Sequence, residues 1–338
     1  MADQTNNTTN TRSGRLNETV PLQPGDSLHI KSSGPITIRG ADGPDVLIKG
    51  IGDMRWSRME QQVSVRIDGP IKALVPRNIT LRLSLDGPIT VEGITAGDID
   101  VISADGPLTI DGGASLRIHD ADGPLNIANI SGAVRVNEAD GPINLKDIGG
   151  DITIEQADGP VTIKRCPGNV DVTNDGSVFL QLDDSVASTV RLRTDGSAYL
   201  KMPAATAVSG VIAGDDRILV ELDQQRIETE DDTVTLSPPE GMLPTISVDI
   251  KVDGDVYIGP NPPAVSANTG FHVSGLGWLG SLFGRKRGTR RDKSVTTPPP
   301  SGQAGADDTL AEREMILRMV AEGKITAQEA AQLLEALE

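Results

Sequence analysis

The sequence predicts an all-β fold, a parallel β-solenoid, and three observations support this prediction. An Asp-Gly-Pro turn recurs along the chain, apolar residues alternate with polar ones between the turns, and aromatic residues are nearly absent from the repeats. A core of Ile, Val and Leu without aromatic bulk suits thin, regular layers better than a large globular interior. The 338 residues suffice for one long repeat domain and a smaller module.

The repeat has a period of ~18 residues, which is typical of a solenoid. From Asp68 onward, successive turns are 18, 19, 17, 18, 18, 17 and 20 residues apart, and the first interval of 26 holds an insertion around Met54 to Gln62. Ser33 begins a degenerate earlier copy of the turn. The turns begin at Asp42, Asp68, Asp86, Asp105, Asp122, Asp140 and Asp158, and continue as Asp-Gly-Ser at Asp175 and Asp195.

Each repeat contains two short strands. An apolar pair such as Ile143 and Leu145 follows the turn, and a second pair such as Ile152 and Ile154 follows a glycine, here Gly150. One unit cannot bury both faces, so we expect the units to stack in register as two parallel sheets around a continuous core. In the turn, Gly is expected to supply a positive φ and Pro to end the ladder. Residues 210–258 are expected to finish and cap the stack.

The composition and pattern divide the chain into four parts. We expect a disordered tail at 1–14, the β-solenoid domain at 15–258, a linker with an apolar and polybasic segment at 259–307, and a helical hairpin at 308–338. The polar start lacks the apolar core of a signal peptide, and no run of about 18 apolar residues could span a membrane. We therefore expect a cytoplasmic protein, peripheral at the inner membrane face.

The formal net charge of −17 argues against nucleic-acid binding, because an acidic body repels phosphate. The single cysteine, Cys166, cannot form an internal disulfide and occupies a repeat position filled by Ile130 and Ile148 elsewhere, which predicts burial.

Residues 271–293 combine an apolar stretch with a basic cluster, a pattern typical of a peripheral membrane anchor. Four glycines in the same stretch disfavour a helix, so a linker that caps the solenoid is the alternative. The candidate membrane-contact residues are Phe271, Leu276, Trp278, Leu279, Leu282, Phe283, Arg285, Lys286 and Arg287.

The last 31 residues predict two amphipathic helices. Gly323 suits the end of the first helix, and Thr326 with Glu329 forms a capping box for the second. Such a hairpin has too little core to be stable alone, so we expect it to bind a protein partner or a second copy. The candidate contact residues are Ile316, Leu317, Val320, Ile325, Leu333, Leu334 and Leu337.

The repeated Asp-Gly-Pro solenoid resembles the bacterial adhesin-like β-solenoid domains of unknown function. The segment from Ile316 to Ala330 resembles the SHOCT-like short C-terminal helical module that accompanies such domains. The resemblance covers residues 15–258 and 308–338. It implies a bacterial source and a role at the cell envelope, and it supplies no catalytic residues.

The stacked turns predict a row of carboxylates at Asp105, Asp122, Asp140 and Asp158. Such a row could hold Ca²⁺ weakly, although a role in the turns themselves is the simpler interpretation. An outward row of Thr and Asn, from Thr90 to Thr162, predicts a solvated polar face. We identify no catalytic residues, cofactor or firm metal site.

These patterns favour a non-enzymatic scaffold or interaction protein whose hairpin mediates self-association or partner docking. Two alternatives remain open: a surface adhesin exported without a classical signal, and a solenoid that binds Ca²⁺ or carbohydrate.

Overall fold

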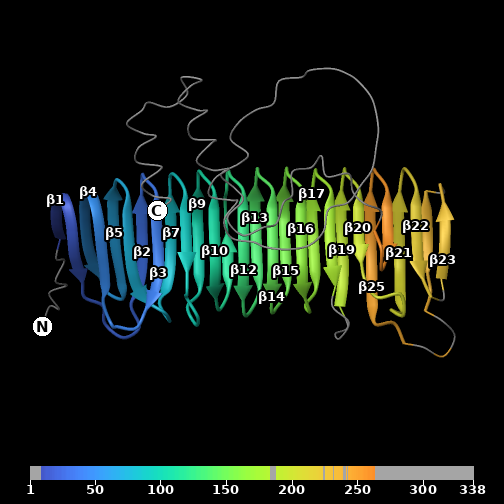
Figure 1. Ribbon diagram of the computed structural model, residues 1–338, viewed down its shortest axis with the longest axis horizontal. Coiled ribbons are helices and arrows are strands. Elements are labelled where there is room, and N and C mark those ends of the chain that lie inside the picture. Colours follow the sequence, from blue (N-terminus) through green and yellow to red (C-terminus); the bar gives the residue numbers. More distant parts are fainter. Residues whose placement is uncertain are drawn as a thin grey trace, which may run out of the picture. The chain divides into compact units, whose positions relative to one another are not determined.

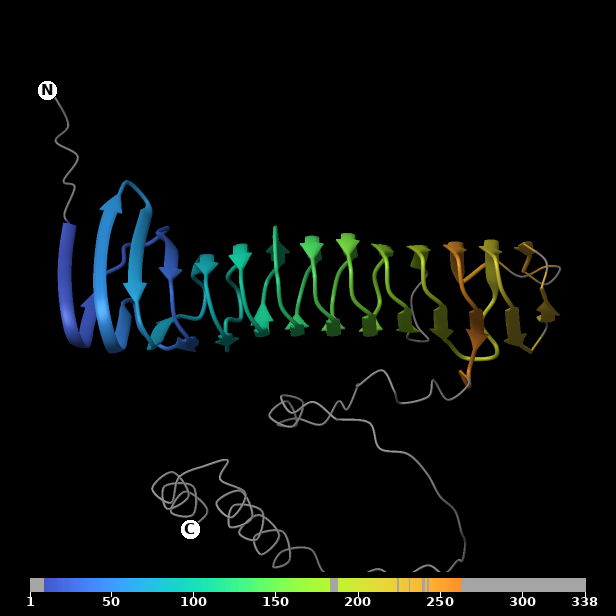
Figure 2. The same cartoon turned by 90° about the horizontal axis from the view of Figure 1, so that it is seen from above.

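The computed structural model describes residues 9–182, 188–223, 225–230, 232–238, 241 and 243–262, and the regular structure in them is β-strand, as predicted. The strands stack side by side (Figure 1). Seen along the strands, they form two rows, which we call sheet 1 and sheet 2 (Figure 2). Within the described part, no helix is long and apolar enough to cross a membrane.

Sheet 1 contains, in spatial order, β5 (Gln62–Asp68), β2 (Ser27–Ser32), β7 (Thr80–Leu85), β9 (Ile99–Ala104), β11 (Leu116–Ile118), β13 (Val134–Ala139), β15 (Ile152–Ala157), β17 (Val170–Asn174), β19 (Ser188–Thr194), β25 (Ile246–Val252), β21 (Val208–Gly214) and β24 (Thr233–Leu236).

Sheet 2 contains, in spatial order, β6 (Ile71–Pro76), β3 (Ile36–Ala41), β8 (Ile89–Glu92), β10 (Leu108–Gly113), β12 (Leu125–Ile130), β14 (Ile143–Ile148), β16 (Val161–Cys166), β18 (Val178–Leu182), β20 (Ala198–Lys201), β26 (Val256–Gly259), β22 (Ile218–Leu222) and β23 (Gln225–Thr229).

Each central coil supplies one strand to each sheet, and equivalent residues of successive coils pair in parallel register. The core is therefore a set of straight apolar rows. In the coil β13–β14 every inward side chain is at most 1% exposed. Each buried Val, Ile or Leu among them stabilises the fold by about 1.5–3 kcal/mol relative to an exposed one. These inward residues are Val134, Val136, Ala139, Ile143, Leu145 and Ile148.

The turn from sheet 1 to sheet 2, which we call the Asp corner, needs glycine for close approach. A Cβ added to Gly141 would lie 2.6 Å from the carbonyl carbon of Gly123, the equivalent residue one coil earlier. The expected positive φ occurs at this corner only in Gly69 and Gly87 among the described turns. The expectation was therefore wrong for most repeats, where the glycines admit the neighbouring backbone instead.

Register also decides which turns belong to the series. Gly34 of the degenerate Ser-Gly-Pro copy lies against Gly69, so this copy is part of the stack. Asp42-Gly43-Pro44 connects β3 to the next strand at the opposite edge of sheet 2, and an added Cβ at Gly43 would meet nothing within 4 Å. The assignment of Asp42 to the series was therefore wrong, because sequence identity alone does not report the edge of the sheet.

The opposite turn, from sheet 2 back to sheet 1, carries a second repeated feature. Asn129, Asp147 and Arg165 occupy equivalent positions in three successive coils with φ of 58°, 56° and 56°. Asn129 Nδ2 donates to Asp111 Oδ1 at 2.6 Å, and Arg165 pairs with the Asp147 carboxylate. Most residues other than glycine disfavour the left-handed backbone conformation. The side-chain bonds of Asn129 and Arg165 help to stabilise the turns that adopt it.

The first end of the stack is closed by antiparallel strands. β4 (Val46–Met59) pairs with β6 through its first half and with β5 through its second, so it crosses both sheets. β1 (Thr9–Val20) pairs with β4 along its whole length. The expected tail at 1–14 was therefore wrong for residues 9–14, which form backbone hydrogen bonds in β1 that their polar side chains did not reveal.

The second end is closed in the same manner. β23 and β24 pair antiparallel with β22 and β21, the outermost coil. The chain then returns, and β25 and β26 insert between that coil and β19–β20. Residues 210–258 thus finish the stack, as expected, and antiparallel strands cover edges that would otherwise be open to another chain.

The Gly141→Ala variant is expected to lose about 1–3 kcal/mol of unfolding free energy, because its Cβ would overlap backbone atoms of the preceding coil. Denaturant unfolding followed by circular dichroism measures the loss. Gly43→Ala is the matched control, since it changes the same tripeptide where space is open. Equal losses in the two variants would contradict the close-approach account.

Candidate binding strip on sheet 2

Sheet 2 presents an outward polar row over its central strands. The members pair in register from β8 to β16, and Asn144 Nδ2 donates to Asn126 Oδ1 at 3.1 Å. The row therefore offers hydroxyl and amide groups on one flat face. Its members are Thr90, Thr109, Asn126, Asn144 and Thr162.

The same row continues as an aromatic column. Phe179 of β18 pairs with Tyr199 of β20, and Tyr199 pairs with Tyr257 of β26. Phe179 and Tyr199 are half-buried although they point away from the core. Aromatic side chains that neighbour each other on adjacent strands pack together, so the column is expected to contribute to the stability of sheet 2.

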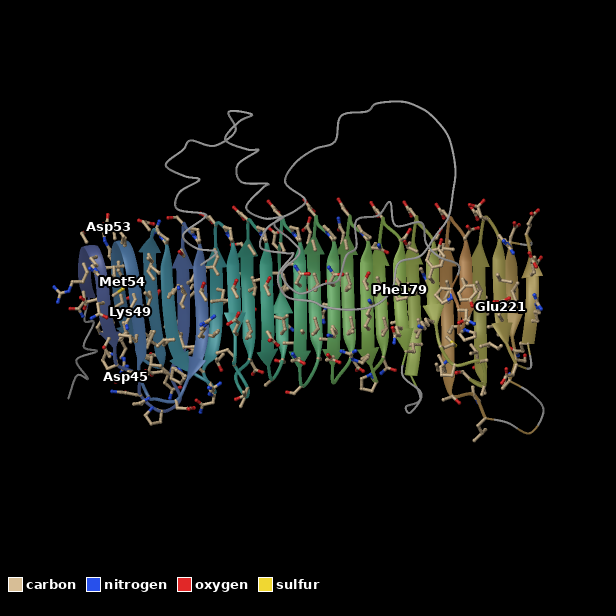
Figure 3. The ribbon with its side chains drawn as sticks, viewed as in Figure 1. Asp45, Lys49, Asp53, Met54, Phe179 and Glu221 are labelled. Atoms are coloured by element: carbon tan, nitrogen blue, oxygen red, sulfur yellow. The ribbon has the colours of Figure 1, made fainter. Side chains whose placement is uncertain are left out.

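Tyr257 is the last ring of the column, and the residues that follow β26 cover it. The Asn261 backbone N–H donates to Tyr257 Oη at 3.0 Å, and this hydroxyl lies 3.3 Å from Glu221 Oε2. Only 2% of Tyr257 is exposed. Burial raises the pKa of the Tyr257 phenol, and the nearby Glu221 carboxylate raises it further. Glu221 lies beyond Phe179 toward the end of the described strands (Figure 3).

A row of lysines flanks the rings. Lys146, Lys164, Gln181 and Lys201 pair in register on four successive strands of sheet 2. Lys164 Nζ lies 5.9 Å from the centroid of the Phe179 ring, within the range of a cation–π contact. Among the described residues, every ion pair uses Arg or His as the cation, so these lysines form none. We call Phe179, Tyr199 and these four residues, together with Asn144 and Thr162 of the polar row, the binding strip.

The coils that carry the rings lack the proline of the Asp corner. Where Ser177 and Ser197 replace Pro in the Asp corner, a backbone N–H becomes available. The Ser197 N–H donates to Ser177 Oγ at 3.3 Å, and the Asp255 N–H donates to Ser197 Oγ at 3.1 Å. Serine thus supplies an acceptor for the donor that proline lacks, and the stack continues unbroken.

Sheet 1 has a different outward chemistry, with arginines and carboxylates mixed along its rows. Arg193 lies 2.7 Å from Asp249, and Arg82 lies 3.4 Å from Asp100. Near the first cap, Arg66 pairs in register with Lys31, and neither forms an ion pair within the described chain. The two sheets therefore differ in chemistry although they share one core.

The candidate Ca²⁺ residues lie along the Asp corner, as the repeat predicts, and all four are exposed. The backbone N–H of each donates to a carbonyl of the preceding coil, for example Asp140 to Ala121 O at 2.9 Å. In the part of the chain that is described, no group of three or more His, Cys, Asp or Glu is placed to hold a metal ion. The four residues are Asp105, Asp122, Asp140 and Asp158.

Cys166 is 1% exposed in the row of Ile130 and Ile148, which confirms its predicted burial. The membrane-contact candidates between Phe271 and Arg287 lie outside the described residues, as do the hairpin candidates from Ile316 to Leu337.

The aromatic column was missed in the sequence. The signal was present, because Phe179 and Tyr199 follow Asp-Gly-Ser at the position that Thr162 holds after Asp-Gly-Pro. Aligning the repeats by their turns would have placed the two rings side by side. Tyr257 holds the same position after Asp253-Gly254, but its place beside Tyr199 could not have been predicted, since β26 pairs with β20 only because the last coil is inserted.

The described chain is thus a capped, mainly parallel β-solenoid with two contrasting faces. The Toastrack DUF4097 family matches residues 11–212, more than half of the chain, and the chain belongs to this family. A SHOCT-like domain matches residues 311–338. The resemblance to adhesin-like β-solenoid domains accompanied by a SHOCT-like C-terminal domain is confirmed by these two matches.

Among solved structures, the chain is similar to a "putative cell adhesion protein" from Clostridium sporogenes ATCC 15579, with 10% identity over 72% of this chain and 99% of that chain. The TM-score of 0.18 is too low to carry an argument about fold or function. No curated protein matches the sequence.

In the Tyr199→Phe variant, Tyr257 is the one remaining tyrosine, and it should ionise above the ordinary pKa of 10.0. Its neutral form is favoured in the fold, so this stabilisation is complete below pH 10 and declines as the pH rises through the folded-state pKa. Ultraviolet absorbance during alkaline titration measures the pKa. Ionisation at or below 10.0 would show that the cover over Tyr257 does not exclude water.

Proposed function

We propose that this protein is a non-enzymatic interaction scaffold whose solenoid displays flat faces to partners. The observation that carries the proposal is the closure of both ends of the stack by antiparallel strands, at β1–β4 and at β23–β24. Capped ends disfavour end-to-end polymerisation and leave the sheet faces as the accessible surfaces. The exposed carboxylates of the Asp corner, which stand in a row rather than in a cleft, further support a role without catalysis.

We infer that the hairpin at 308–338 supplies self-association or partner docking. Its two predicted apolar stripes need a surface to cover them, and a second copy is the simplest one. Joining copies through the hairpins would present several solenoid faces together, and avidity would then strengthen weak contacts at each face.

Deletion of residues 308–338 is expected to lower the oligomeric state to a monomer without changing the solenoid. Light scattering after size-exclusion chromatography measures the mass, and circular dichroism checks the sheet content. Replacing Leu333 and Leu334 by Asp should have the same effect without removing any chain. A full-length chain that is already monomeric would rule out self-association and leave docking to another protein.

For residues 271–293 we propose contact with the inner membrane face, which would keep the scaffold cytoplasmic and peripheral. The support is compositional: an apolar stretch beside a basic cluster has two independent sources of affinity for an anionic bilayer.

The full chain should therefore co-sediment with anionic vesicles, less so at high salt, whereas a chain truncated after residue 268 should not. Salt weakens the binding because it screens the attraction between the basic cluster and the lipids. Equal sedimentation of both chains would place the contact on the solenoid, and failure of both would leave the segment as a linker.

Carbohydrate binding is the second candidate function, and the aromatic column favours it. Phe179 and Tyr199 expose ring surface on a face where most other positions are polar. An adhesin role would use the same face on the outside of the cell.

A further inference from the structure

We propose that the binding strip of sheet 2 takes an extended acidic polysaccharide. The proposal rests on the interaction role proposed above and names the ligand class for one face. It requires three kinds of group in one place: rings for the apolar faces of sugars, cations for their carboxylates, and polar side chains for their hydroxyls. All three lie on β14, β16, β18 and β20.

The rings are placed for stacking rather than for the core. Phe179 and Tyr199 point away from a core that is already filled by Val178, Leu180 and Leu200, each 0% exposed. Register on neighbouring strands sets the two side chains at about the strand spacing of ~4.8 Å. A sugar ring has one apolar face of C–H groups, and such a face stacks on an aromatic side chain that is flat and partly exposed.

The lysines give the site its charge preference. Lys146 and Lys164 are direct neighbours across two strands, and like charges so placed repel each other. No carboxylate of the described chain forms an ion pair with them, although carboxylates are numerous enough to give a net charge of −17. An anionic ligand would relieve that repulsion and form charge-assisted hydrogen bonds with the ammonium groups.

The polar row completes the strip. Asn144 and Thr162 precede Phe179 in the same outward row, and Gln181 lies between the lysines in the next row. These side chains can donate to and accept from hydroxyl groups on both sides of a chain that runs across the strands.

A carboxylate lies beyond each end of the strip, Glu221 at one end and Asp111 at the other. Beyond β20, the next outward ring, Tyr257, is covered and lies against Glu221. Before β14, the row of the lysines continues through Ala128 to Asp111. The four strands between these limits span about 14 Å at ~4.8 Å per strand, which accommodates an oligosaccharide of a few units.

Single-stranded nucleic acid also combines stacking with negative charge, but it fits less well. It carries a phosphate on every nucleotide and offers few hydroxyl groups to the polar side chains of the strip. A polysaccharide with one carboxylate per sugar carries a similar charge per unit, and it presents many more hydroxyls to Asn144, Thr162 and Gln181. The observations therefore favour the acidic sugar.

The test uses the full chain and polygalacturonate as the probe, with dextran as the neutral polymer and oligothymidylate as the nucleic acid. Calorimetry should detect binding to polygalacturonate that weakens as salt is added. The double variant Phe179→Thr/Tyr199→Thr is chosen because Thr occupies this row in neighbouring coils. Lys164→Gln/Lys201→Gln removes two charges from the strip. Each pair should lower the affinity at least ~10-fold, about 1.4 kcal/mol.

The matched control is Lys31→Gln/Arg66→Gln, which removes two neighbouring cations from sheet 1. It should leave the affinity unchanged, and circular dichroism should show the same fold in all variants. An equal loss in the control would overturn the proposal, because binding would then depend on charge alone. Equal binding of dextran, or tighter binding of oligothymidylate, would overturn the assignment to acidic sugars.

Absence of polygalacturonate binding in a folded, oligomeric chain would overturn the site and leave the scaffold role standing. A full chain that binds polygalacturonate but forms no oligomer would overturn self-association through the hairpin and leave the sugar site standing. The failures of the two proposals are thus distinguishable.

Discussion

The rise from one coil to the next is the constraint on which the remaining structure depends. Backbone hydrogen bonds between equivalent residues fix it near the strand spacing of ~4.8 Å. Every residue must then tolerate a copy of its own position above and below. At the Asp corner the backbones of Gly123 and Gly141 approach so closely that no side chain fits between them. In the core the same repetition places aliphatic residues in rows and makes bulky aromatic side chains unnecessary.

This constraint restricts the side chains that point into the core, whereas the outward-pointing side chains can vary from coil to coil. Val161, Val178 and Ala198 fill one core row with similar side chains, whereas the residues after them are Thr162, Phe179 and Tyr199. A solenoid can therefore change the chemistry of a face from coil to coil without altering its fold. The contrast between the arginine rows of sheet 1 and the lysines and rings of sheet 2 arises in this way.

Local periodicity in the sequence was enough to predict the central coils. Pairs such as Ile143 and Leu145, and the buried Cys166, lie where the repeat placed them because successive coils are also neighbours in space. The order of the strands at the two ends could not be predicted, since β5 and β6 precede β2 and β3 in the stack and β25–β26 precede β21–β22. These inversions depend on pairing between distant segments, which no local pattern encodes. The aromatic column was predictable in part, through the equivalence of Phe179 and Tyr199.

The inversions have a consequence for the site. An uninterrupted chain would place β22 next to β20, and Leu219 would then follow Tyr199 in the outward row. Because β26 is inserted, Tyr257 follows instead, and the chain that leaves β26 passes over its ring. The topology that protects the end of the stack therefore also ends the exposed part of the aromatic column. Capping and the limit of the binding strip are two results of one inserted coil, so a change that straightened the topology would alter both.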